Sequence, residues 1–294
     1  MRITSIGAIS FKTCWVVAWL LLTTEPGHCD SAEEQQEERW FEAELEVNDS
    51  GFPASFIDSL RQAKNVSYRA ALRAIPSSLY LRREKLVLTA SWGPVTAGWA
   101  MLCATPDSAD LTTDFAIKAV TNRFVSAFFR VRDYICSTID ARGLYPVFFQ
   151  EHIREGRYAD RRWALYDQAN RTVYSNRKGS GTVSIKLFSQ DFMSVLYYIR
   201  SRSLTPGDTF SVPCYVHGKN YDVFFRCGKR KEIDTKAGTF DCISVEPTLV
   251  GEGRNFSKKD KLILWLTDDD RHMPVYVKSK IKVGSVVGEL IHYE

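Results

Sequence analysis

The sequence predicts an all-β fold with one or two short helices, in which an antiparallel meander closes into a large barrel or two half-barrels. Three observations predict it: apolar and polar residues alternate from about residue 84 onward, turn residues recur between these segments, and the connections are short. Strands joined by short turns pair with their neighbours in sequence. A sheet of about ten to thirteen strands curls on itself, so we expect closure.

The first 29 residues have the pattern of a secretory signal peptide. A basic N-terminus precedes an uncharged run at residues 14–22, which is too short to cross a bilayer. Small residues favour cleavage before Asp30. The alternatives are an anchor that stays attached and a lipoprotein acylated at Cys29. We therefore expect an exported, periplasmic protein, associated with the outer membrane if Cys29 is lipidated, with no transmembrane span after cleavage.

Residues 30–80 are expected to form a charged N-terminal leader, and residues 81–294 a single barrel-like β-domain. In the leader, Phe56 and Leu60 lie at helical spacing, and Ser55 is the expected N-cap. Pro76 ends the leader. If the protein is a scaffold in the envelope, the leader is the candidate surface for contact with other proteins.

The period of the apolar residues changes to two at residue 84, where a hairpin begins around a turn at Gly93-Pro94. The returning strand is expected at 95–104. A third strand surrounds Lys118, and a short aromatic helix is expected within 122–130. Further strands are expected at about 132–139, 146–155, 162–168 and 171–176.

A second helix is expected to open at Asp191. Its apolar positions include Val195 and Ile199, and Arg200 suits the negative end of the helix dipole. The rest of the chain alternates again. Its strands are expected at about 209–217, 220–232, 238–247, 262–266, 275–283 and 285–293.

Cleavage before Asp30 would leave five cysteines: Cys103, Cys136, Cys214, Cys227 and Cys242. Export permits disulfides, and Cys227 and Cys242, on neighbouring strands, are the best candidate pair. The alternative for each cysteine is a small buried apolar residue. No metal-ligand spacing occurs in the sequence, and we expect neither a metal nor another cofactor.

The charge of the chain is only mildly positive, at +4, whereas nucleic-acid-binding proteins carry a larger and clustered basic excess. Nucleic acid is therefore not an expected partner. The hydrophobic fraction of 45% is that of a folded chain.

Catalytic motifs of serine hydrolases and zinc proteases are missing from the sequence, and we assign no catalytic residue. His217 and His272 are expected at turns and in solvent. A glycosidase needs only two carboxylates, so strand-borne acids are the alternative. They are Asp133, Asp140, Glu151, Glu155 and Asp167. The run Asp268-Asp269-Asp270 follows a strand and either holds a cation or makes the turn itself.

A basic stripe and paired aromatic residues are the candidate ligand contacts. The stripe consists of Tyr276, Lys278, Lys280 and Lys282. It is either a solvated strand face that protects an edge, or a contact for anionic lipid or acidic polysaccharide. Phe149 and Phe225 each follow another phenylalanine, and adjacent strand residues point to opposite faces. We expect one member of each pair to line a barrel cavity.

Several short motifs, in order from about Tyr80 to Glu294, resemble the bacterial exported family called domain of unknown function 3108. The motifs are Lys85-Leu86, Trp92-Gly93-Pro94-Val95-Thr96-Ala97-Gly98, Tyr145-Pro146, Glu155-Gly156, Pro206-Gly207, Gly218-Lys219, Gly238-Thr239-Phe240-Asp241-Cys242 and Trp265-Leu266-Thr267-Asp268-Asp269. Arg83-Glu84 stands where the family pattern has Gly-Glu. The resemblance implies an exported, barrel-like all-β domain, similar to envelope and capsule-export proteins. It implies no established chemistry.

These observations favour an exported, non-enzymatic protein that binds or assembles components of the cell envelope and holds an amphiphilic or glycan ligand. Its expected partners are a lipid or polysaccharide and other envelope proteins. Two alternatives stay open: a carbohydrate-active hydrolase with two strand-borne carboxylates, and a protein–protein scaffold in the envelope.

Overall fold

The computed structural model describes residues 51–66, 72–75, 82–177, 181–251, 262–280 and 284–294. The predicted signal peptide, its cleavage site, Cys29 and Lys282 lie outside these ranges.

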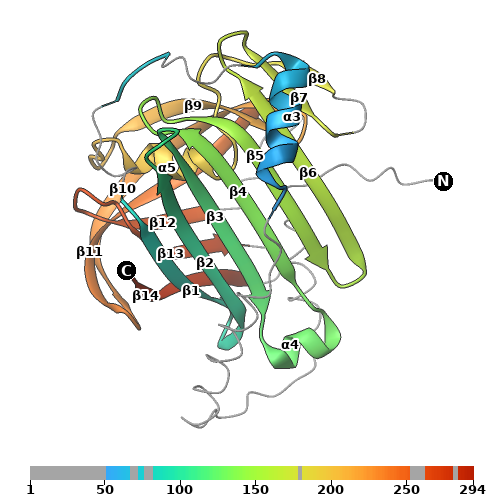
Figure 1. The fold of residues 1–294 in the computed structure, drawn as a ribbon. Helices are drawn as coiled ribbons and strands as arrows, with labels where there is room; N and C mark the ends of the chain where they lie inside the picture. The colour runs from blue at the N-terminus through green and yellow to red at the C-terminus, as the bar shows by residue number, and fades with distance from the viewer. Residues whose placement is uncertain (1–50, 67–71, 76–81, 178–180, 252–261, 281–283) are drawn as a thin grey trace, which may run out of the picture.

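The described part of the domain forms one antiparallel sheet of fourteen strands (Figure 1). Its first eight strands are β1 (Glu84–Trp92), β2 (Val95–Asp107), β3 (Thr112–Thr121), β4 (Arg132–Asp140), β5 (Tyr145–Glu155), β6 (Tyr158–Asp167), β7 (Thr172–Ser175) and β8 (Thr182–Ser184). The others are β9 (Thr209–Val216), β10 (Lys219–Thr235), β11 (Gly238–Gly251), β12 (Leu262–Thr267), β13 (Pro274–Lys280) and β14 (Ser285–Tyr293). The helices in the described ranges are α3 (Ala54–Lys64), α4 (Arg123–Phe128) and α5 (Ser194–Arg200).

The strand order runs from β8 down to β1, continues with β14, and runs back to β9. Each strand therefore pairs with its neighbours in sequence, except that β1 pairs with β14 in the middle of the sheet. We call β1–β8 the first half and β9–β14 the second half. The predicted antiparallel meander is confirmed, because alternating residues and short turns dictate it locally.

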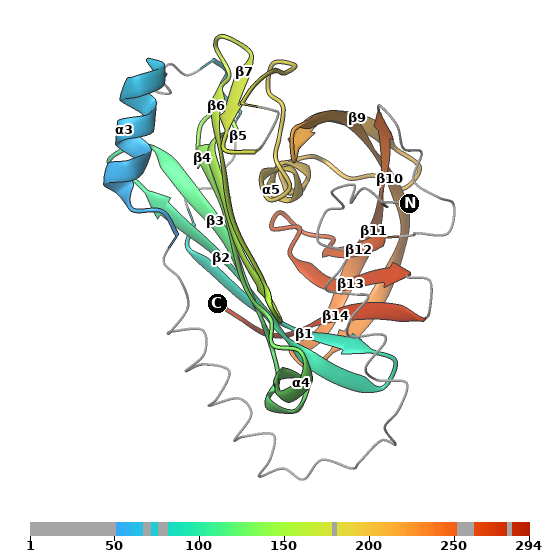
Figure 2. The same cartoon turned by 90° about the vertical axis from the view of Figure 1, so that its right-hand side faces the viewer.

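The two end strands, β8 and β9, are not hydrogen-bonded to each other in the described part of the chain, so hydrogen bonds do not close the sheet into a barrel. The segment before α5 lies beside β9 instead: the backbone N–H of Gln190 donates to Pro213 at 2.8 Å, and that of Tyr215 donates to Gln190 at 2.8 Å. Figure 2 shows the two halves facing each other across α5. We call the boundary between these two facing halves the seam.

Most predicted elements are confirmed, including both short helices in the β-domain. The strand β8 was not predicted, because its three residues lie in a polar stretch with no alternation. Ser55 is not the N-cap of α3; Pro53 occupies that position and makes no side-chain cap. Asp191 accepts hydrogen bonds from the backbone N–H groups of Met193 and Ser194, both at 2.7 Å. The helix α5 nevertheless begins three residues later than expected, at Ser194, and its N-cap is Met193.

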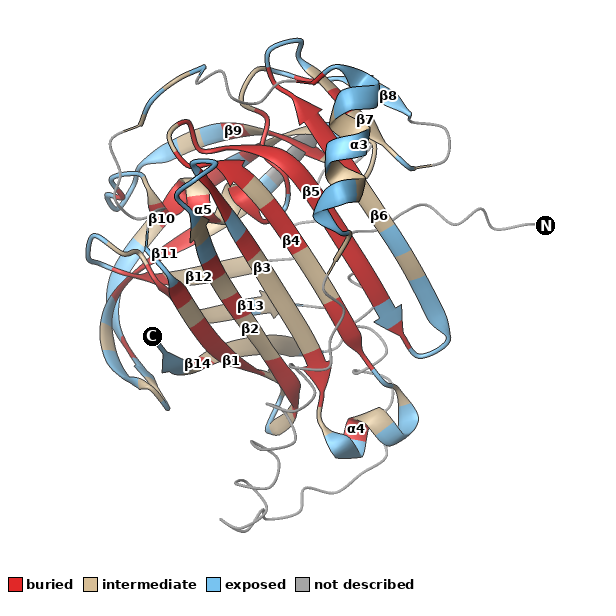
Figure 3. Ribbon diagram, in the orientation of Figure 1, coloured by how far each residue is buried: buried red, intermediate tan, exposed pale blue. Residues whose placement is uncertain are grey.

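Buried residues lie along the strands of both halves (Figure 3). The paired phenylalanines follow the predicted alternation. Phe149 is part of the core of the first half, while Phe148 packs under α3 on the other face. Phe225 is part of the core of the second half, while Phe224 is exposed.

The leader does not stand apart from the domain where the structure describes it. Phe52 and Leu60 pack against buried Phe148 and Leu165 on the outer face of the first half. The backbone N–H of Phe52 also donates to Gln150 Oε1 at 2.6 Å. Apolar contacts thus hold α3 on the sheet.

A buried ion pair fixes α5 to the middle of the sheet. The guanidinium of Arg200 makes two parallel hydrogen bonds to Glu84, at 2.7 and 2.8 Å, and it is fully buried. Tyr197 on the same helix stacks on Phe115 with ring centroids 3.4 Å apart. A bidentate pair of this kind fixes the orientation of the two side chains relative to each other. Removal of one partner would be strongly destabilising, because it would leave the other charge buried and uncompensated.

All five cysteines of the β-domain are free thiols. The expected Cys227–Cys242 disulfide is wrong, because the register places Cys227 opposite Val245 and Cys242 opposite Lys231. The two sulfurs are therefore several residues apart along the paired strands. The alternative is confirmed for four of the five thiols, which are buried in the core; Cys103 is half-buried.

Candidate functional site

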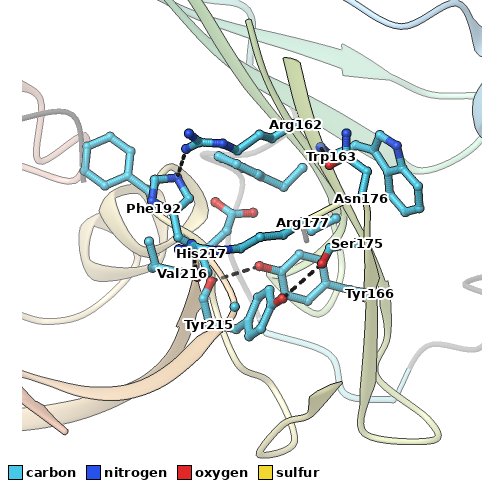
Figure 4. Close-up of a pocket in the computed structure, with 14 residues that line it drawn as sticks. Arg162, Trp163, Tyr166, Ser175, Asn176, Arg177, Phe192, Tyr215, Val216 and His217 are labelled. Carbon is cyan, nitrogen blue, oxygen red and sulfur yellow. Dashed lines mark hydrogen bonds between the residues drawn. The ribbon is translucent and has the colours of Figure 1, made fainter. Parts of the chain in front are cut away.

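A recess opens at the seam, where β6 and the end of β7 face the turn between β9 and β10 (Figure 4). It is lined by Phe149, Arg162, Trp163, Ala164, Tyr166, Ser175, Asn176, Arg177, Asp191, Phe192, Tyr215, Val216, His217 and Gly218. We call it the seam recess. Its cavity volume is about 30 Å³, which is room for about two water molecules. It admits a single small chemical group, while a larger molecule would lie across its rim.

A two-residue turn places His217 at this recess. His217 and Gly218 both have positive φ, 49° and 84°, and Val216 pairs with Lys219 across the turn. These are the features of a type I′ hairpin, whose twist matches that of the strands. Glycine meets the requirement at the second position, and histidine is among the residues that tolerate it at the first.

Glu151 on β5 joins the two halves through His217. Its carboxylate lies 2.9 Å from His217 Nε2 and accepts a hydrogen bond from Arg162 Nη1 at 2.7 Å. Burial alone would raise the pKa of Glu151, but the hydrogen bond and charge of His217 and the charge of Arg162 outweigh it, and the pKa is lowered. Glu151 is therefore a carboxylate at neutral pH.

Further polar contacts hold the arginines of the recess. Arg162 Nη2 donates to Tyr158 Oη at 2.8 Å and lies 2.5 Å from Asp160 Oδ2. Arg177 Nη1 donates to the backbone carbonyl of His217. Arg162 and Arg177 were not among the predicted site residues. The alternation of β6, which puts Arg162 on the same face as Ala164 and Tyr166, was the signal available for Arg162.

A second carboxylate, Asp133, lies on the same inner face one strand away, near the pairing of Ile135 with Glu151. Burial raises the pKa of Asp133 to about 7; the backbone N–H of Arg154 opposes the shift, and the charges of Glu155 and Glu151 add to it. Adjacent strands thus carry one carboxyl group that stays ionised and one that is half-protonated near neutral pH.

Aromatic side chains form the apolar wall of the recess. Tyr166 Oη donates to the backbone carbonyl of Tyr215 at 3.1 Å, and the Tyr215 hydroxyl lies 3.4 Å from Ser175 Oγ. Phe149 is buried behind them. Phe192, at the rim, is 44% exposed although it is a large apolar residue. An exposed ring beside a charged recess is available for stacking or apolar contact.

The other predicted ligand residues lie elsewhere. Phe225 is in the core of the second half, stacked on Phe210 with centroids 5.3 Å apart. Lys278 and Lys280 are exposed on β13, beside half-buried Tyr276, whose pKa is raised by burial. The predicted ligand residues that the structure describes are thus distributed over three places, and among them only Phe149 lines the seam recess.

Three of the predicted acidic positions make turns, which was the simpler alternative. Asp140 accepts from the backbone N–H groups of residues 142 and 143, and Asp167 accepts from that of Asn170. Asp269 accepts from the backbone N–H groups of Arg271 and His272.

The expectation that both turn histidines are solvated is wrong. His217 contacts Glu151, as described above. His272 Nδ1 lies 2.8 Å from the backbone carbonyl of Arg200 and is thereby tied to the end of α5. Backbone turns can present side chains inward as well as outward, and the sequence alone does not distinguish the two.

Within the described ranges, no cluster of three or more His, Cys, Asp or Glu side chains is placed to hold a metal ion. None of the helices in those ranges combines the length and apolarity needed to cross a membrane.

Comparison with solved structures finds a similar fold in one case with a TM-score above 0.5. A β-barrel-like protein of the domain of unknown function DUF1849 from Brucella abortus is 9% identical, with a TM-score of 0.52, and the match covers 72% of this chain and 97% of that one. A candidate lipoprotein from Parabacteroides distasonis is 12% identical over 72% of this chain and 95% of its own, with a TM-score of 0.31. A candidate exported protein with a YmcC-like fold from Bacteroides fragilis is 8% identical over 76% and 99%, also with a TM-score of 0.31.

Comparison with curated proteins finds no significant match. A family model described as "Protein of unknown function (DUF3108)" matches residues 88–291, which is most of the chain. The motifs quoted above fall largely within this range. The protein belongs to the DUF3108 family.

Proposed function

We propose that this protein is an exported, non-enzymatic binding protein that holds a glycan or amphiphilic ligand at the seam recess. The pattern of residues 1–29 supports export to the periplasm. The observation that carries the binding proposal is the recess itself, where Phe192 is exposed at the rim beside Arg162 and His217.

The dimensions of the recess limit the way a ligand binds. A cavity of about 30 Å³ accepts one small polar group, such as a hydroxyl or carboxylate. The remainder of the ligand would lie over Phe192, since aromatic rings stack on sugar rings and acyl chains alike through their apolar faces. Glu151 neutralises part of the charge of Arg162, so neutral or singly charged groups fit the recess best.

Native mass spectrometry of protein purified from its own envelope tests this proposal, followed by titration with neutral oligosaccharides, galacturonate oligomers and a lysophospholipid. The variant Phe192→Ser should weaken binding of the best probe about threefold to tenfold, as expected for loss of one aromatic contact. Phe224→Ser is the matched control, because Phe224 is 45% exposed and lies on β10 away from the recess. Empty protein and no binding of any probe would refute the proposal.

A hydrolase is the second candidate, favoured by the two carboxyl groups of the inner face. Asp133, with its pKa raised to about 7, suits a general acid, and Glu151, with its lowered pKa, suits a nucleophile or base. Chromogenic glycosides test this reading. Turnover that is lost in both Asp133→Asn and Glu151→Gln would favour the hydrolase over the binding protein, whereas no turnover of any glycoside would favour binding alone.

A further inference from the structure

We propose that the tip formed by α4 and the turn between β5 and β6 is a docking surface for an anionic lipid bilayer. This surface lies at one end of the sheet, as Figures 1 and 2 show for α4. We call it the α4 tip and define it as residues 122–131 and 154–158. It is distinct from the seam recess, and the inference stands independently of the proposed ligand-binding function.

Two large apolar side chains project from the tip. Phe124 is 52% exposed and Phe128 is 64% exposed, and their ring centroids lie 5.5 Å apart. They are four residues apart and therefore lie on the same face of the helix. An adjacent pair of exposed phenylalanines is unusual on a solvated surface and is typical of sites that contact a membrane or a partner.

The structure holds these rings outward on a rigid base. Val125, between them, is buried against Ala97 and Trp92. Asn122 caps the helix by accepting from the backbone N–H of Val125 at 2.8 Å, and its amide donates to the backbone carbonyl of Thr96 at 2.8 Å. Because the base is anchored, Phe124 and Phe128 cannot turn inward without breaking these contacts.

A second hydrogen-bonded link holds the other end of α4. The hydroxyls of Thr121 and Ser126 lie 2.8 Å apart, and Thr121 Oγ1 accepts from the backbone N–H of Val131 at 3.0 Å. The β5–β6 turn is joined to the same base, since the backbone N–H of Gly156 donates to the carbonyl of Arg130 at 2.8 Å. The two segments of the tip therefore form one surface.

The charges of the α4 tip determine its partner. Its exposed charged residues are Arg123, Arg130, Arg154 and Arg157, and the one acidic residue in its sequence, Glu155, is buried. Exposed Tyr158 adds a ring with a polar end. Aromatic residues that enter the headgroup region, ringed by arginines that attract anionic headgroups, match the surface of a bilayer with acidic lipids.

Vesicle co-sedimentation tests the proposal with protein as it is isolated from its own envelope. Vesicles of phosphatidylcholine with about one third phosphatidylglycerol should bind the protein more tightly than pure phosphatidylcholine vesicles do. Phe124→Ser/Phe128→Ser should lower the partition coefficient about tenfold or more, since two rings no longer leave water. Arg123→Gln and Arg157→Gln should each lower it about fivefold.

Phe224→Ser is the matched control, because it removes an equally exposed phenylalanine from the second half and should leave binding unchanged. Hydrogen exchange on vesicle addition should show protection within residues 122–131. Equal binding of all variants, or protection only outside the tip, would overturn the proposal. So would loss of vesicle binding in the arginine variants alone, with polygalacturonate as an effective competitor, because that result would identify a polysaccharide contact.

Discussion

The inner faces of the two halves of the sheet differ in kind. The first half buries charged side chains, among them Glu84, Asp133, Glu151 and Glu155. In the described part of the second half, the buried polar side chains are Ser244 and Thr267, and the rest of its buried core is apolar. Burial of charge is costly unless it is compensated, whereas burial of Ile, Val and Phe is favourable.

This difference indicates that the second half contributes mainly to stability, whereas the first half carries the groups that could take part in chemistry. The second half supplies apolar packing. Its β9–β10 turn also supplies His217, whose side chain contacts Glu151 of the first half. The first half supplies the carboxyl groups and Arg162. Substitutions in the second half should therefore act on stability in a manner that does not depend on pH, and substitutions in the first half should act through charge.

The largest effect is expected for Glu84→Ala. This variant leaves the guanidinium of Arg200 buried without its bidentate partner, which should lower the free energy of unfolding by about 3–5 kcal/mol. Urea denaturation measures it. The double variant Glu84→Leu/Arg200→Met should recover most of the loss, and Glu246→Ala, which breaks an exposed pair with Arg226, should cost less than about 1 kcal/mol. A small loss in Glu84→Ala would contradict the role of this pair.

A cavity in the second half should have the next largest effect. Ile243→Ala, at a fully buried position of β11, should lower the free energy of unfolding by about 2–4 kcal/mol. The loss should be the same at pH 5 and pH 8, because the core around Ile243 is built from apolar side chains. A loss of stability that varied strongly with pH would contradict the proposed difference between the two halves.

Asp133→Asn should stabilise the protein at pH 8, by roughly 1–3 kcal/mol. The folded pKa of Asp133, about 7, is raised above the unfolded value near 3.8, so the folded state binds the proton more tightly. The stabilisation that the proton on Asp133 provides is therefore fully present below about pH 3.8, and it is lost as the pH rises to about 7. The variant should make the fall in stability between pH 4 and pH 7 shallower by removing the contribution of Asp133, which thermal or urea unfolding at a series of pH values would measure. An unchanged slope would refute the assignment.

The smallest effect is expected on the outer face of the second half. Lys278→Ala, at an exposed position of β13, should change the free energy of unfolding by less than about 0.5 kcal/mol. Binding of probes at the seam recess should also be unaffected, since Lys278 does not line it. Weakened binding in this variant would restore the basic stripe as a ligand contact.

The fold was largely predictable because its information is local. Alternation and turn residues locate nearly every strand, and sequential antiparallel pairing follows from short connections. Closure was not predictable, because it depends on how far the accumulated curvature brings β8 toward β9. The pairing of β1 with β14 joins residues about 200 positions apart, such as Thr89 and Glu289, and no local pattern encodes it.

The candidate site was predictable only in part. Glu151, Asp133 and His217 were all considered from the sequence, but their relation was not, because it depends on register across β4 and β5 and on a turn that crosses the seam. The alternation of β6 places Arg162 on the same face as Ala164 and Tyr166, but Arg162 belongs to no recognisable motif. The proposed Cys227–Cys242 bridge failed because the β10–β11 turn sets a register in which Cys242 lies opposite Lys231, four residues from Cys227. The bulge between Cys227 and Arg230 changes this register by only one residue.

The position of β1 at the centre of the sheet has a consequence for how the protein is made. Lys85 exchanges backbone hydrogen bonds with Glu294, the last residue of the chain, at 2.9 and 3.3 Å. While the polypeptide emerges from the ribosome, or threads through an export channel, β1 has only β2 beside it. Its other edge stays unpaired until residues 285–293 have been made, so the two halves can be joined only after every other strand of the sheet has been synthesised. A chain truncated before β14 would retain an exposed edge on β1, which is a template for aggregation.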